Sequence, residues 1–140
     1  MKVEHRLRAK VNAHDMRPKS LGQFDIVERT FRFALQIVQL CQEIDGKPGV
    51  ARTLALQLLR SGTSIGANVE EAQAGQSRAD FISKYSIALK EARESAYWLR
   101  LLDESNILKA SPIEPLRTEA SEIGRILGAI VSKTKRNSQP

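Results

Sequence analysis

The sequence is poor in the residue types on which most enzyme and metal chemistry depends. It contains one cysteine, Cys41, and two histidines, His5 and His14, in 140 residues. A disulfide within the chain is therefore impossible, and the apolar helical pattern around Cys41 is typical of an inert core thiol. Because both histidines lie in the first 22 residues, the rest of the chain offers none for a zinc site, a di-metal site or a Ser-His nucleophile. We expect no enzymatic activity, no metal and no cofactor.

Aromatic residues and long apolar runs are also scarce. Aromatic residues make up 5% of the chain, whereas 41% of the residues are hydrophobic and 27% are charged. This composition favours aliphatic helix packing over an aromatic-rich sheet. No apolar run approaches the roughly 18 residues that a membrane span needs, and no signal-like segment opens the chain. We therefore expect a soluble, cytoplasmic protein with no membrane association.

The formal net charge of +6 comes from the two ends of the chain. Residues 1–22 hold six Lys and Arg against two acidic residues, and three further cations follow residue 132, whereas residues 23–132 hold 13 basic and 14 acidic residues. We predict a basic flexible arm over residues 1–22, a folded domain over residues 23–132 and a basic tail over residues 133–140. Such ends can bind phosphate backbones or acidic partners, or simply solubilise a domain.

Four segments between residues 24 and 132 have apolar residues at spacings of three and four, which is typical of packed helices. Turn and capping signals separate them: Gly46 to Gly49 with Pro48, then Gly75 followed by a capping-box-like start at Ser77, then Pro112 and Pro115. The sequence predicts an all-α, antiparallel up-down-up-down four-helix bundle, because the loops are too short for crossovers. In the third helix, Lys84 is predicted to pair with Asp80, and Glu94 with Lys90, each four residues away.

The first helix is apolar on two sides. One stripe comprises Phe24, Val27, Phe31, Ala34, Val38 and Cys41. A helix in a four-helix bundle normally needs only one apolar face. We therefore predict that the opposite stripe contacts other copies of the chain in a homo-oligomer, with Ile26, Phe33, Ile37, Leu40 and Ile44 as the interface candidates.

The packing side of the second helix contains unusually small residues. Gly62 and Gly66 each cost about 1 kcal/mol against alanine in a helix interior, so we predict that a neighbouring helix approaches closely there. The alternative is a helix break, with residues 61–64 as a loop. Asn68 is predicted to hydrogen-bond a neighbouring helix end or loop and fix the register, with ligand recognition as the alternative.

Nucleic-acid binding is the activity that the charge distribution suggests. The candidates are cations of the ends and of the body that have no obvious acidic partner one turn away: Arg52, Arg60, Arg78, Lys133, Lys135 and Arg136. No recognition-helix motif is present, and Tyr97 and Trp98 are expected in the core or at a subunit contact. Binding would therefore be directed at phosphates, sensitive to salt and weakly sequence-specific.

The segment from Leu59 to Glu71, Leu-Arg-Ser-Gly-Thr-Ser-Ile-Gly-Ala-Asn-Val-Glu-Glu, resembles the second-helix signature of the bacterial four-helix bundle proteins encoded in intervening sequences of 23S ribosomal RNA genes. Residues 77–81 and 87–102 resemble the third helix of that family, and the likeness spans about residues 24–132. Residues 122–128 and the basic residues after them are also similar to the accessory variability determinant proteins of diversity-generating retroelements.

The resemblance implies a homopentameric, non-enzymatic assembly that binds nucleic acid, with RNA favoured, or an RNA-handling partner. The second group implies association with a reverse transcriptase; a protein-interaction scaffold without nucleic-acid contact is the alternative. Ala72 stands where the family usually has glycine. Carried onto this chain, the signature points to Arg60, Ser61, Ser64, Asn68 and Glu71.

Overall fold

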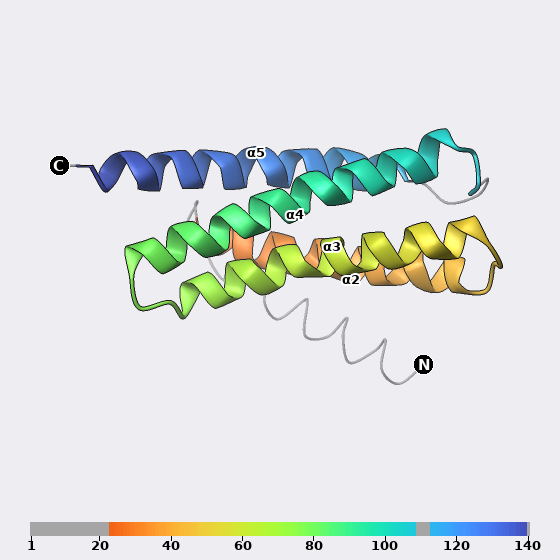
Figure 1. Cartoon of the computed structure of the whole chain (residues 1–140), viewed down its shortest axis with the longest axis horizontal. Helices are drawn as coiled ribbons and strands as arrows, with labels where there is room; N and C mark the ends of the chain where they lie inside the picture. Colours follow the sequence, from red (N-terminus) through yellow and green to blue (C-terminus); the bar gives the residue numbers. More distant parts are fainter. Residues whose placement is uncertain (1–22, 109–112, 140) are drawn as a thin grey trace.

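The structure, a computed structural model, describes residues 23–108 and 113–139, so the predicted arm over residues 1–22 lies outside the described residues. It contains four helices, labelled α2 (Gln23–Asp45), α3 (Val50–Gln73), α4 (Arg78–Glu104) and α5 (Glu114–Asn137). Each helix packs against the next, and α2 also packs against α5, so α2 and α4 lie diagonally across the bundle, as do α3 and α5. The chain reverses direction at each loop, and α4 crosses obliquely between α3 and α5 (Figure 1). The predicted all-α antiparallel bundle is confirmed.

Local sequence signals set most of the helix boundaries. The Ser77 hydroxyl accepts a 3.1 Å hydrogen bond from the Asp80 amide, which is the predicted cap of α4. Pro115 lies in the first turn of α5, where its missing amide hydrogen costs nothing. Helix α5 continues to Asn137, so the predicted boundary after residue 132 is too early and the last cations lie on a helix. No helix in the described ranges is long and apolar enough to cross a membrane.

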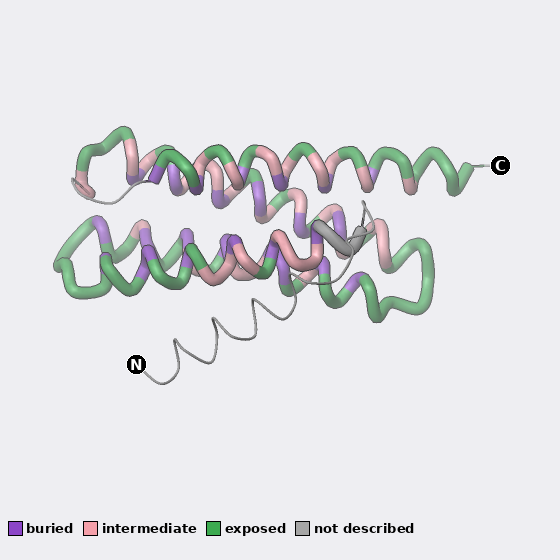
Figure 2. Tube along the Cα trace, turned by 180° about the vertical axis from the view of Figure 1, so that it is seen from behind, coloured by how far each residue is buried: buried purple, intermediate pink, exposed green. Residues whose placement is uncertain are grey.

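The stripe of α2 that was predicted to face other subunits is in fact the core of the chain itself. Ile26, Phe33, Ile37 and Ile44 are at most 1% exposed and Leu40 is 6% exposed. Their assignment as oligomer interface candidates is therefore wrong. The opposite stripe is only partly open: Phe31 is 46% exposed and Val38 is 36% exposed, whereas Cys41 is buried. Buried residues line the inward sides of all four helices (Figure 2).

The small residues of α3 decide which side of α2 faces inward. A Cβ added at Gly62 would lie 2.9 Å from Cγ2 of Ile37, and one at Gly66 would lie 3.3 Å from the backbone of Thr30. The predicted close approach of a neighbouring helix is thus confirmed. Helix α3 runs unbroken through residues 61–64, so the alternative of a loop there is wrong.

Ion pairs connect neighbouring helices around the bundle. Arg29 of α2 pairs with Glu119 of α5 at 2.6 Å, and Arg117 of α5 pairs with Asp103 of α4 at 2.8 Å. Lys84 was predicted to pair with Asp80, but its ammonium group lies 3.0 Å from the carboxylate of Glu71 on α3. Because these side chains are partly exposed, water and salt screen each pair and it contributes little stability.

Candidate nucleic-acid interface

Four of the six predicted nucleic-acid-binding cations lie at one end of the bundle, where α5 ends and α4 begins. Arg78 and Lys133 line one groove of about 470 Å³, whose other lining residues include Ile126, Ala129 and Ile130. The guanidinium Nη1 of Arg78 donates a 2.9 Å hydrogen bond to the carbonyl oxygen of Asn137. This bond ties the start of α4 to the last turn of α5.

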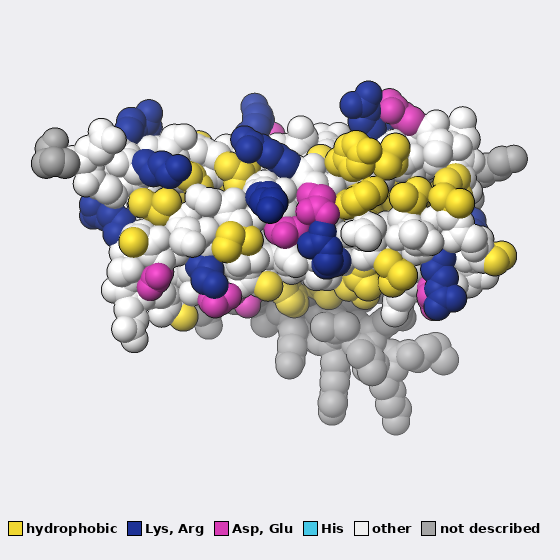
Figure 3. Space-filling view, in the orientation of Figure 1, with side chains coloured by type: hydrophobic (Ala, Val, Ile, Leu, Met, Phe, Trp, Pro, Cys, Tyr) yellow, Lys and Arg dark blue, Asp and Glu magenta, His cyan; other side chains and the backbone are white. Residues whose placement is uncertain are grey.

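The last turn of α5 completes the cluster. Lys135 and Arg136 are exposed there, and their positive charge also complements the negative end of the helix dipole. We refer to Arg78, Lys133, Lys135 and Arg136 as the basic end. Lys and Arg side chains are visible over this end of the molecule, at the left of Figure 3.

The other two candidates lie elsewhere and are engaged in ion pairs. Arg60 forms a hydrogen bond through Nη2 with Oε1 of Glu94, and its Nη1 lies 3.5 Å from Oε2 of Glu91. The bond with Glu94 raises the pKa of Arg60 and lowers the pKa of the Glu94 carboxyl. Arg52 lies at the opposite end of α3 from the basic end, 3.6 Å from Asp45. Sequence reasoning considered only partners one turn away, and these partners lie on other helices or beyond a loop.

The residues of the helix-2 signature have structural roles in this fold. Ser61 is fully buried and accepts a hydrogen bond from Ser95 of α4, at 2.9 Å. Ser64 donates to the Arg60 carbonyl at 2.6 Å, and the Asn68 amide donates to the Ser64 carbonyl at 2.8 Å. The bond of Asn68 therefore stays within its own helix, whereas a bond to a neighbouring helix or loop was predicted.

No group of three or more His, Cys, Asp and Glu residues that could hold a metal occurs across residues 23–108 and 113–139. Cys41 is 8% exposed, and its thiol lies 3.4 Å from the carbonyl oxygen of Ala55, to which it donates. Burial raises the pKa of this thiol from 9.0 to about 11, which suppresses the reactive thiolate at neutral pH.

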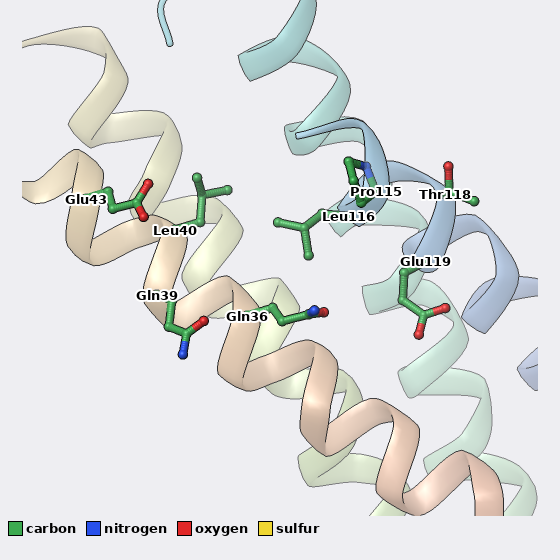
Figure 4. Close-up of a pocket in the computed structure, with 8 residues that line it drawn as sticks. All are labelled: Gln36, Gln39, Leu40, Glu43, Pro115, Leu116, Thr118 and Glu119. Carbon is green, nitrogen blue, oxygen red and sulfur yellow. The ribbon is translucent and has the colours of Figure 1, made fainter. Parts of the chain in front are cut away.

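Two further grooves lie beside α2. The first is a groove of about 450 Å³ where α2 and α5 meet, lined by Gln36, Gln39, Leu40, Glu43, Pro115, Leu116, Thr118 and Glu119 (Figure 4). The second is an apolar groove of about 270 Å³ on the outside of α2 and α3, whose lining includes Val38, Leu56 and Leu59. Leu56 is 59% exposed. We refer to Phe31, Val38, Leu56 and Leu59 as the outer α2/α3 face.

A family model described as "23S rRNA-intervening sequence protein" matches residues 22–129. The chain belongs to this family. The resemblance seen in the helix-2 signature is confirmed, whereas the link to retroelements stays a prediction. The match to this 23S rRNA-intervening sequence protein family spans α2, α3, α4 and most of α5, and it ends before Lys133, Lys135 and Arg136. Most of the basic end is thus outside the part that defines the family.

A solved relative of this 23S rRNA-intervening sequence protein has the same fold. It is a crystal structure, at 1.70 Å resolution, of a protein of unknown function from the S23 ribosomal protein family of Bacteroides thetaiotaomicron. The two chains are 40% identical, with a TM-score of 0.71 over 79% of this chain and 97% of that chain. No curated protein matches the sequence.

Sequence reasoning missed one surface, the outward side of α4. Tyr97 was expected in the core or at a subunit contact, but it is 56% exposed, so the core assignment is wrong. Lys90, Arg93 and Arg100 are exposed on the same side of the helix. Their spacing of three and seven residues was visible in the sequence, but which side of α4 faces outward depends on its packing against α3 and α5.

Proposed function

We propose that this protein is a non-enzymatic homo-oligomer that binds RNA through its basic end. The observation that carries the proposal is the convergence of Arg78 and Lys133 on one groove, with Lys135 and Arg136 exposed beside it. The family description refers to intervening sequences of 23S rRNA, which supports RNA as the nucleic acid.

The chemistry of the basic end suits phosphates more than bases. Three of its four members lie on the last two turns of α5, and in the described part of the chain none of the four has a salt bridge to an acidic side chain. Neutralising several phosphates releases bound counterions and makes affinity fall steeply with salt. The proposed binding is therefore weakly sequence-specific.

The outer α2/α3 face supports the oligomeric part of the proposal. Phe31, Val38 and Leu56 are all at least 36% exposed, and Val38 and Leu56 also line an apolar groove. A second copy that covered this face would remove apolar area from water, which contributes about 25 cal/mol per Å². A pentamer, as the family resemblance implies, would repeat the basic end five times and raise the avidity for a long RNA.

RNA binding can be tested by fluorescence anisotropy with a labelled hairpin RNA at 50 to 200 mM salt. We expect Lys133→Ala to weaken binding and to reduce the salt slope by about one unit, as the loss of one phosphate contact should. The matched control is Lys47→Ala, which removes one exposed charge from the loop between α2 and α3 at the opposite end. If the unaltered protein binds no RNA even at 50 mM salt, RNA binding is refuted and a protein scaffold remains.

Oligomerisation can be tested by light scattering at micromolar concentration. Leu56→Lys places a charge in the outer α2/α3 face and should reduce the measured mass. Ile87→Lys is the matched control, because Ile87 is 39% exposed on α4, which is diagonal to α2. A monomeric mass for the unaltered protein would refute the oligomer without touching the RNA hypothesis.

A further inference from the structure

The outward side of α4 combines an exposed aromatic ring with three cations. Lys90, Arg93, Tyr97 and Arg100, which we call the α4 strip, lie three, four and three residues apart. This spacing places them on one side of the helix, opposite the buried Ala88, Ala92, Ser95 and Leu99. The strip runs from residue 90 to residue 100, a rise of about 15 Å along the helix axis.

The cations of the strip are available for a ligand. Neither Lys90 nor Arg93 has a salt bridge to any residue that the structure describes. Arg100 pairs with Glu104 at 3.0 Å, but both side chains are more than half exposed, so water and salt screen this pair. Figure 3 shows Lys and Arg side chains over the middle of α4, with acidic side chains between them and a hydrophobic patch beside them.

The acidic residues nearest the strip are already held by another helix. Glu94 is bonded to Arg60 of α3, and Glu91 lies 3.5 Å from the same guanidinium. The Glu91 side chain is only 14% exposed. The Glu94 side chain is 28% exposed, so α4 presents three cations and two partly covered carboxylates between residues 90 and 100, and Arg60 offsets part of the negative charge.

The ring of Tyr97 is supported in place. It makes an edge contact with Trp98, with ring centroids 5.1 Å apart and an interplanar angle of 73°. The indole nitrogen of Trp98 in turn donates a 3.2 Å hydrogen bond to Glu94, whose carboxylate Arg60 also binds. A supported ring that is 56% exposed can stack on a flat ligand with little loss of conformational entropy.

From this arrangement we infer that the α4 strip binds unpaired nucleotides, with a base stacked on Tyr97 and phosphates bound by Lys90, Arg93 and Arg100. Aromatic platforms flanked by cations are how proteins hold single strands, because every base has a stacking face whereas the cations follow the backbone. A duplex hides those faces, so the strip should discriminate between paired and unpaired RNA. The inference rests on the proposed RNA binding but uses residues other than the basic end.

The test uses the intrinsic fluorescence of Trp98, the only tryptophan in the chain. A 12-nucleotide oligouridine is titrated into the full chain, and a blunt RNA duplex of the same length is titrated in parallel. Oligouridine should change the Trp98 emission, and Tyr97→Ala should weaken oligouridine binding about tenfold, the loss expected for one base–aromatic stack. Duplex affinity, measured by anisotropy, should stay within twofold. Tyr97→Phe should retain the binding of oligouridine, and Val50→Ala at the start of α3, where Val50 is 66% exposed, is the control for loss of an exposed apolar side chain.

Three other results would overturn the proposed function or the inference. If the unaltered protein binds neither RNA, the proposed function itself fails. If it binds RNA but Tyr97→Ala and Tyr97→Phe both match the unaltered protein, the α4 strip is not the site and the inference is overturned. A reduced mass of Tyr97→Ala in light scattering would also overturn it, by identifying Tyr97 as a contact between copies.

Discussion

The hydroxyl of Ser95 on α4 donates a 2.9 Å hydrogen bond to the hydroxyl of Ser61 on α3, and both side chains are completely buried. Two small polar side chains thus meet where large apolar ones are usual. Ser95 also lies 2.8 Å from the Glu91 carbonyl, and Ser61 lies 3.3 Å from the Leu58 carbonyl, so neither hydroxyl depends on one partner. The pair lets α3 and α4 pack closely without leaving a polar group unsatisfied.

Replacing Ser61 should therefore lower the free energy of unfolding only a little when the new residue is small, and more when it is large. We expect Ser61→Ala to lower the free energy of unfolding by about 1 kcal/mol, because Ser95 can instead donate its hydrogen to the Glu91 carbonyl, 2.8 Å away. Ser61→Leu should cost at least another 1 kcal/mol through overpacking. Urea denaturation measures both, with Ser121→Ala on the exposed side of α5 as the control. Equal stability of the leucine and alanine variants would show that α3 and α4 are not closely packed there.

The glycines of α3 and α5 should respond in opposite directions to alanine. Gly62→Ala should lower the free energy of unfolding by about 1 to 3 kcal/mol, because the new Cβ would lie 2.9 Å from Ile37. Gly124→Ala should raise it by up to about 1 kcal/mol, since nothing lies within 4 Å of that Cβ and alanine favours the helix. Thermal denaturation of the two variants shows whether each is more or less stable than the unaltered protein. A stabilising Gly62→Ala would contradict the close approach of α2 and α3.

Phe31 and Phe33 offer a matched test of which side of α2 faces the core. Phe33 is completely buried whereas Phe31 is 46% exposed. Phe33→Ala should therefore cost about 3 to 5 kcal/mol of unfolding free energy. Phe31→Ala should cost less than about 1 kcal/mol at protein concentrations low enough to disfavour any oligomer. Urea denaturation at several protein concentrations distinguishes them, and the reverse ranking would restore the stripe assignment that the structure contradicts.

The ion pair between Arg60 and Glu94 should make stability depend on pH in acid. The bond from Arg60 lowers the pKa of the Glu94 carboxyl in the folded chain, so the folded state binds fewer protons than the unfolded state. The contribution of Glu94 is thus present above the unfolded carboxyl pKa of about 4.3 and is lost as pH falls through the lower, folded pKa.

Glu94→Gln measures that contribution. The variant should have a lower free energy of unfolding than the unaltered protein at pH 7. This gap in unfolding free energy should close towards pH 2. Urea midpoints at both pH values give the result, with Glu70→Gln on the exposed side of α3 as the control for loss of one negative charge. High salt should narrow the gap at pH 7, because the pair is partly exposed. A gap independent of pH would show that Glu94 acts by packing and not by charge.

Local sequence patterns predicted the helices and much of what separates them. The loop before Val50 and the cap at Ser77 appear where their signals lie. Gly62 and Gly66 also indicated close packing, since two glycines in a helix interior need a compensating contact. The end of α5 was harder to predict, because residues 133–137 are polar and have no apolar repeat, yet they continue the helix.

The candidate site was only partly predictable, because partners on other helices decide which cations are available. Arg60 has no acidic residue one turn away, and the structure supplies Glu94 and Glu91 from α4. Arg78 and Lys133 are far apart in the sequence, yet they line one groove because the antiparallel order returns α5 to the start of α4. Tyr97 lies within a largely apolar segment, and only the packing of α4 shows that its ring faces outward.

The sequence alone determined that this chain forms four amphipathic helices joined by short loops, because helix formation depends on spacing, caps and turn residues that lie close together in the chain. The tertiary structure decided which side of each helix is covered. Helix α2 has two stripes of similar apolarity, and spacing cannot choose between them. The choice depends on the fit of Ile37 and Thr30 against the two glycines of α3, which is a property of two helices packed together.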